Sequence, residues 1–173
     1  NPVRTFGGQM MAQAFVAGSR TVAQNLPPNA LSVHFIAGGD PSRDLEFQVV
    51  ALRDERRFAN RRVDVTQDGA LLATALISFL SGGRGLEHGV AAPDVPAPDG
   101  LPKIDRLLEG YEHTVPLFAE ALRPIEWRYT NDPAWVMRDK GERLDHNRVW
   151  MTAEGPMPDD PVLHNAALVY SSD

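Results

Sequence analysis

Asp173 is the residue whose type and position most clearly suit chemistry. It follows the run LVYSS at residues 168–172, the end of a mostly apolar stretch. A carboxylate at such a place can serve as a general base, and it can equally end or cap a helix. Ser171 and Ser172 lack the GxSxG surroundings of a nucleophile, so they are interpreted as helix or turn residues. The residues alone leave both interpretations of Asp173 open.

Gly7 and Gly8 form a second candidate site, in the stretch TFGGQMMAQAF at residues 5–15. Backbone N–H groups at the start of a helix can bind an anion or a carbonyl oxygen, which makes both glycines candidate substrate-binding residues. The pair can also simply let the backbone turn tightly into a buried helix. The spacing matches neither GxGxxG nor GxxxxGK[ST], so a nucleotide-binding loop is not predicted.

Histidines and arginines supply the other groups that could do chemistry. The five histidines show no HxxxH or HExxH spacing, so no metal site is predicted, and His34 is given no catalytic role. Arginines gather around one predicted hairpin, where they could contact a phosphate. We favour solvated salt bridges with Asp54, Glu55 or Asp64 instead. The clustered arginines are Arg53, Arg56, Arg57, Arg61 and Arg62.

Composition narrows the class of protein. The net charge of -6 argues against broad nucleic-acid binding, which needs a basic face. The absence of cysteine excludes disulfides and a cysteine nucleophile, and it is compatible with a reducing cytoplasm. No stretch approaches the roughly 20 apolar residues of a membrane span, and no basic-then-apolar leader opens the chain. With 43% hydrophobic residues, the 173-residue chain can form a packed core.

The hydrophobic pattern of the elements that position these residues changes along the chain, from the period of a helix to that of strands. Residues 9–22 are apolar on most sides, which predicts a buried helix. Strands are predicted over 31–37, 45–52, 57–65 and 70–80, and Asp68-Gly69 predicts a hairpin between the last two. The first part of the chain is therefore predicted to be one helix followed by antiparallel strands.

Glycine and proline dominate residues 82–102, which predicts a linker. Beyond it, we predict a short helix pair over 103–122, strands over 124–129 and 149–154, and a helix over 161–173 that Asp159-Asp160 begins. This last helix weakly echoes the first one. If the halves are repeats, we expect a further strand before Asn1 and further strands after Asp173.

Several stretches together carry a resemblance to a known family. They are FGGQ, RRFANRRV, PAPDGLP, RPIEWR, VWMTAEG and VLHNAALVYSSD, and they occur in the family's order over nearly the whole chain. The sequence resembles the acyl-CoA thioesterase II (TesB-like) family, a double-hotdog family. It departs from the family at residues 37–40, where AGGD replaces the usual Arg-Pro-Gly-Asp turn.

The resemblance implies an α+β double hotdog, in which a curved antiparallel sheet wraps around a central apolar helix. We expect a first hotdog unit at residues 1–81 that lacks its first strand. An inter-unit linker with short helices follows at 82–123. Residues 124–173 are expected to start a second hotdog unit, which is truncated in this chain.

The resemblance also implies an activity, the hydrolysis of fatty acyl-CoA to a free fatty acid and CoA. Asp173 would help to activate a water, together with a Ser or Thr and a Gln that lie beyond Asp173. No cofactor is implied, and the resemblance implies a homodimer or higher homo-oligomer. We expect a cytoplasmic enzyme of fatty acid metabolism. Two alternatives stay open: a hotdog enoyl-CoA hydratase, and a non-catalytic acyl-binding or assembly module.

Overall fold

The computed structural model describes residues 4–83, 85–114 and 124–173, which belong to two compact units. The first unit comprises the chain up to Leu86 together with Pro158–Asp173. The second unit is Glu87–Met157. The first unit therefore combines the two ends of the sequence.

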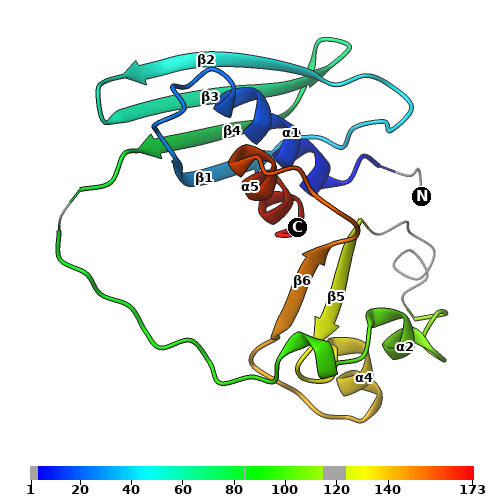
Figure 1. Ribbon diagram of the computed structural model, residues 1–173. Coiled ribbons are helices and arrows are strands. Elements are labelled where there is room, and N and C mark those ends of the chain that lie inside the picture. The colour runs from blue at the N-terminus through cyan, green and yellow to red at the C-terminus, as the bar shows by residue number, and fades with distance from the viewer. Residues whose placement is uncertain (1–3, 84, 115–123) are drawn as a thin grey trace. The chain divides into compact units, whose positions relative to one another are not determined.

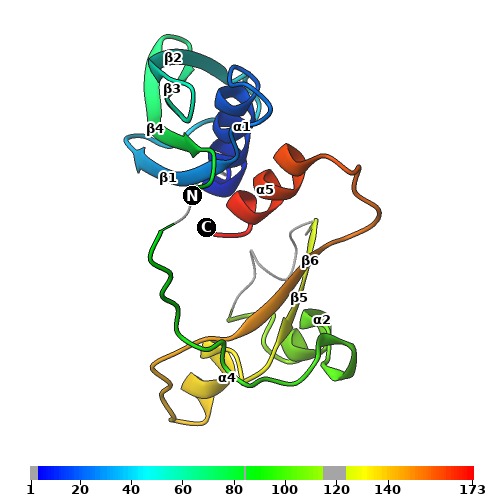
Figure 2. The ribbon, with the colours of Figure 1, turned by 60° about the vertical axis from the view of Figure 1, so that its left-hand side comes forward.

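A four-stranded antiparallel sheet is the frame of the first unit. Figure 2 shows it curving around helix α1. Its strands are β1 (Pro28–Phe35), β2 (Glu46–Asp54), β3 (Phe58–Gln67) and β4 (Ala70–Leu80), in the spatial order β1-β4-β3-β2. Asp68 and Gly69 have φ of +49° and +78°, which is the two-residue hairpin turn predicted from the sequence. The four predicted strands are thus confirmed, with the ends of β1, β2 and β3 shifted by one to three residues and those of β4 as predicted.

Helix α1 (Gly7–Ser19) packs on one face of this sheet and forms the core with it. Met10, Ala14 and Phe15 are buried, as the all-round apolar pattern predicts. The helix lies close to the strands because small residues of the helix face the sheet. At Gly18, an added Cβ would come within 2.6 Å of Ile77 Cδ1. The helix begins two residues before the predicted start and ends at Ser19 rather than at residue 22.

Arg61 ties the C-terminal end of α1 to the β2–β3 hairpin. Arg61 is 3% exposed, and its guanidinium donates to Thr21 Oγ1 at 2.7 Å and Thr21 O at 3.0 Å. It also forms an ion pair with Asp54 at 2.7 Å. Exposed pairs join Arg53 to Glu55 and Arg62 to Asp64. The predicted salt bridges of the arginine cluster are therefore confirmed, but the burial of Arg61 was not foreseen.

Helix α5 (Pro161–Tyr170) lies against α1 in the same unit (Figure 1). The Asp160 side chain accepts the Val162 N–H at 2.8 Å, so the predicted acidic helix start is confirmed. The helix ends at Tyr170, which places Asp173 just after it rather than inside it. Contacts group α5 with the first unit, whereas the sequence assigns residues 124–173 to a second repeat. The grouping of residues by contacts does not test where a repeat begins in the sequence. The predicted boundaries of 1–81, 82–123 and 124–173 therefore stay a prediction.

The second unit is built on a two-stranded antiparallel sheet of β5 (Ile125–Tyr129) and β6 (Val149–Ala153). Its other elements within the described residues are η1 (Pro98–Gly100), α2 (Ile104–Leu108) and α4 (Ala134–Asp139). The buried side chains of Ile104, Leu108 and Tyr129 form its core. The helix pair predicted over 103–122 is represented by α2, and residues 115–123 lie outside the described part. Helix α4 was missed because six residues are too few to show an apolar period.

A polar network of Lys103, Glu126 and Arg128, which we call the Glu126 latch, joins the PAPDGLP stretch to β5. Arg128 Nη1 donates to Pro98 O at 2.9 Å and to Leu101 O at 3.2 Å. Glu126 accepts from Arg128 Nε at 2.7 Å and pairs with Lys103. The Lys103 and Arg128 hydrogen bonds lower the pKa of Glu126 below its ordinary value of 4.5. Two of the stretches that carry the family resemblance are thus in direct contact.

Candidate functional site

The carboxylate of Asp173 lies at the N-terminus of α1. The Gly8 N–H donates to Asp173 Oδ2 at 3.1 Å, across 165 positions of sequence. Phe6, at the N-cap of α1, offers no side-chain cap, and the first turn holds no acidic residue. The carboxylate from the end of α5 supplies a partner there, where the helix dipole favours a negative charge. The residues that the sequence marked at the two ends of the chain therefore meet.

Gly7 and Gly8 make this approach possible because each occupies a place with no room for a side chain. A Cβ on Gly8 would lie 2.3 Å from Tyr170 O, a backbone atom of α5. A Cβ on Gly7 would lie 2.8 Å from Asp173 Oδ2 and 3.0 Å from Phe35 Cζ. The sequence indicates a tight turn into the helix at these glycines, and the structure adds a close approach by the C-terminal end of α5.

Three aromatic side chains surround this contact. Phe6 packs edge-to-face on Tyr170, with ring centroids 5.0 Å apart. Phe35, at the end of β1, reaches Gly7 with the tip of its ring. Phe6 and Phe35 are 41% and 47% exposed, although both are large and apolar. The carboxylate therefore has apolar surface around it and is itself accessible.

One carboxylate oxygen of Asp173 is held and the other is available. Oδ2 accepts the Gly8 N–H, and within the described residues no hydrogen bond is assigned to Oδ1. An anchored carboxylate with a free oxygen can accept a proton from a water placed beside it. The arrangement thus permits general-base chemistry next to an apolar surface.

Comparison with known proteins decides the family. Residues 1–80 match the model of the acyl-CoA thioesterase N-terminal domain, and residues 118–173 match that of acyl-CoA thioesterase. The mouse protein named acyl-coenzyme A thioesterase 8 is 28% identical over 98% of this chain and 56% of its own length. The chain belongs to the acyl-CoA thioesterase II family. It spans little more than half the length of the curated relatives it matches.

Solved structures agree with this family assignment and with the fold. The acyl-CoA thioesterase II TesB2 from Mycobacterium marinum is 29% identical, with a TM-score of 0.73 over 98% of this chain and 59% of that one. A protein from Alicyclobacillus acidocaldarius described as having a hot dog fold is 24% identical, with a TM-score of 0.70 over 99% of this chain and 60% of its own. The predicted α+β hotdog fold is confirmed.

The histidines of this thioesterase-family chain are not bonded to Asp173 within the described residues. His34 is an exposed residue of β1, opposite Thr74 of β4. The described residues contain no group of three or more His, Asp or Glu side chains arranged to hold a metal. Within the same described residues, no helix is both long and apolar enough to cross a membrane.

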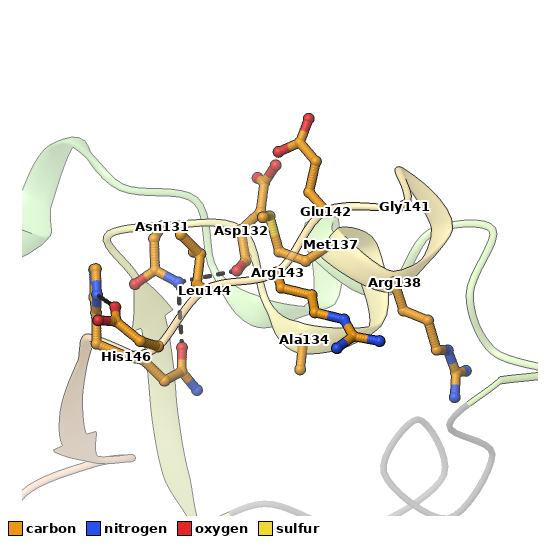
Figure 3. A pocket seen from close by; sticks show the side chains of 12 residues that line it. Asn131, Asp132, Ala134, Met137, Arg138, Gly141, Glu142, Arg143, Leu144 and His146 are labelled. Carbon is orange, nitrogen blue, oxygen red and sulfur yellow. Dashed lines mark hydrogen bonds and ion pairs between the residues drawn. The ribbon is translucent and has the colours of Figure 1, made fainter.

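A hollow of about 760 Å³ lies in the second unit, along α4 and the loop after it (Figure 3). Asn131 lines the hollow and donates to Asp132 O and, at 3.4 Å, to Asn147 Oδ1. Its charged side chains are of both signs, so they favour no class of ligand. They are Asp132, Arg138, Glu142, Arg143 and Asp145. We assign it no role in the site at Asp173.

Phe6, Phe35 and Tyr170 were not recognised from the sequence. Each reads locally as an ordinary core or strand residue, and only the packing of α5 on α1 brings them to one place. A usable signal was present in the glycine pair, because two adjacent glycines at a helix start indicate that something approaches closely. The sequence did not indicate what approaches.

Proposed function

We propose that the protein of which this chain is part is an acyl-CoA thioesterase that hydrolyses fatty acyl-CoA to a free fatty acid and CoA. The observation that carries the proposal is the Asp173 carboxylate, held by the Gly8 N–H beside apolar side chains. Membership of the acyl-CoA thioesterase II family supports the same reaction.

In the proposed mechanism Asp173 is the catalytic base. Its Oδ1 accepts a proton from a water as that water attacks the thioester carbonyl carbon. The tetrahedral oxyanion then collapses, the C–S bond breaks, and the proton on Asp173 passes to the departing sulfur, which releases CoA and restores the carboxylate. The Gly8 N–H holds Oδ2 and so fixes the direction of Oδ1. Gly7 is the proposed substrate-binding donor, because its N–H at the start of α1 can point to the developing oxyanion. A Ser or Thr and a Gln beyond Asp173 are expected to complete the site.

The oligomeric state and the cellular location of the enzyme are also proposed. The family resemblance supports a homodimer or higher homo-oligomer, which light scattering on the purified protein would measure. The cysteine-free sequence is compatible with a cytoplasmic enzyme of fatty acid metabolism, which cell fractionation would test. No cofactor is needed for the proposed steps, because the base is a side chain and the nucleophile is water.

Free-CoA release from short, medium and long acyl-CoAs tests the proposal in the complete protein. We expect Asp173→Asn to lower kcat by about 10²- to 10⁴-fold, because the amide cannot accept the proton of the water. Asp159→Asn is the matched control: Asp159 is exposed and precedes α5, so its kcat should be unchanged.

The outcomes separate the alternatives. Equal turnover in wild type and Asp173→Asn would remove Asp173 from the mechanism. Absence of turnover with every acyl-CoA, together with binding of acyl-CoA, would favour the non-catalytic acyl-binding module. Hydration of an enoyl-CoA without CoA release would favour the hydratase.

A further inference from the structure

Phe35 occupies an unusual place for a large apolar side chain. It is the last residue of β1, and its ring tip meets the same point above Gly7 that Asp173 meets. A Cβ placed on Gly7 would lie 3.0 Å from Phe35 Cζ and 2.8 Å from Asp173 Oδ2. The ring and the carboxylate therefore converge at the start of α1.

The ring is left 47% exposed in this position. An aromatic ring gains free energy when apolar surface covers it, so a half-exposed ring beside a polar group favours an apolar ligand. Exposure of a single apolar residue is ordinary in itself. Here the exposure coincides with the carboxylate to which the proposed function assigns the chemistry.

The chemistry fixes which part of a substrate can reach this ring. A water that Asp173 activates must lie about 3–3.5 Å from the thioester carbonyl carbon when it attacks. The atoms bonded to that carbon are then within a few ångströms of the carboxylate. The distal end of a long acyl chain is much farther away, because each methylene adds more than an ångström.

We propose that Phe35 contacts the first acyl carbons, those beside the thioester carbonyl, and thereby positions the carbonyl over Asp173. This inference rests on the proposed function for the identity of the ligand. It makes Phe35 a positioning residue whose contribution is the same for short and long acyl chains. Free CoA, which has no acyl carbons, gains nothing from the ring.

Binding of thioether analogues tests this without hydrolysis. The dissociation constants of S-butyl-CoA, S-octyl-CoA, S-dodecyl-CoA and free CoA are measured for the complete protein. We expect Phe35→Ala to weaken binding of all three thioethers by the same factor, about tenfold, and to leave free CoA unchanged. Phe35→Leu, which keeps apolar contact, should stay within about threefold of wild type.

Phe58→Ala is the matched control. Phe58 is a phenylalanine of the same unit, 42% exposed, and pairs with Leu80 of β4. Phe35 pairs with Ala73 of the same strand, so seven residues, roughly 23 Å, separate the two positions along β4. The control should bind every ligand as wild type does.

Three results would overturn the inference. They are equal weakening of free CoA, weakening confined to the dodecyl ligand, and thioether binding that Phe35→Ala leaves unchanged. Failure of the proposed function is distinguishable from these. A wild-type protein that binds the thioethers through Phe35 and hydrolyses no acyl-CoA would refute the reaction and keep the contact. A wild-type protein that binds no thioether would refute the contact.

Discussion

At the N-terminus of α1, two neighbouring glycines meet different kinds of atoms. Gly8 faces the backbone oxygen of Tyr170, which cannot move without shifting α5. Gly7 faces the ends of the Asp173 and Phe35 side chains, which can rotate away. One glycine therefore serves the packing of two helices, and the other serves the geometry of the carboxylate.

We expect Gly8→Ala to lower the free energy of unfolding by about 1–3 kcal/mol. The new methyl group overlaps Tyr170 O, and the overlap outweighs the gain of up to about 1 kcal/mol in helix propensity. Urea unfolding followed by far-UV circular dichroism measures the loss. Gly7→Ala is the matched comparison, with a stability within about 1 kcal/mol of wild type. A Gly8→Ala protein as stable as wild type would show that α5 does not pack this closely.

The two ends of α1 are fixed by different means. At the N-terminus a single hydrogen bond to Asp173 joins it to the end of α5. Near the C-terminal end, the buried Arg61 guanidinium bonds to Thr21 and Asp54. The helix is therefore attached to α5 at one end and to the β2–β3 hairpin at the other.

Removal of the Arg61 anchor should be costly. We expect Arg61→Ala to lower the free energy of unfolding by about 3 kcal/mol or more, since it leaves Thr21 O without its donor and empties a buried site. Arg53→Ala is the matched control, because Arg53 is exposed and pairs with exposed Glu55. Its change should stay within about 0.5 kcal/mol. Equal losses in the two variants, by urea unfolding, would contradict the assigned role.

At the scale of the whole molecule, local sequence patterns predicted the helices and strands, whereas the contacts between distant parts of the chain were not predicted. The Asp68-Gly69 turn and the Asp160 helix start were predictable because their conformations depend on neighbours in sequence. The bond from Gly8 to Asp173 spans 165 positions, so no periodicity encodes it. The family resemblance pointed to Asp173, whereas the position of Phe35 follows only from the fold. Burial of Arg61 was missed because a charged side chain is rarely buried.

The two units differ in their tryptophan content. All three tryptophans, Trp127, Trp135 and Trp150, belong to the second unit. Tryptophan fluorescence of the 173-residue chain therefore reports on that unit. The Glu126 latch lies in the same unit, so its effect on stability can be read separately from changes at α1.

The latch should make the second unit sensitive to acid. Hydrogen bonds from Lys103 and Arg128 lower the folded-state pKa of Glu126 below 4.5, so the unfolded chain takes up the proton first as pH falls. The stabilisation is complete above pH 4.5 and is lost as pH falls from there through the folded-state pKa. We expect Glu126→Gln to lower the urea midpoint seen by tryptophan fluorescence at pH 7 and to flatten its decline below pH 4.5. Glu154→Gln, at an exposed position of the same unit, should keep the wild-type profile. An unchanged acid profile in Glu126→Gln would mean that the latch contributes nothing to the stability of this unit.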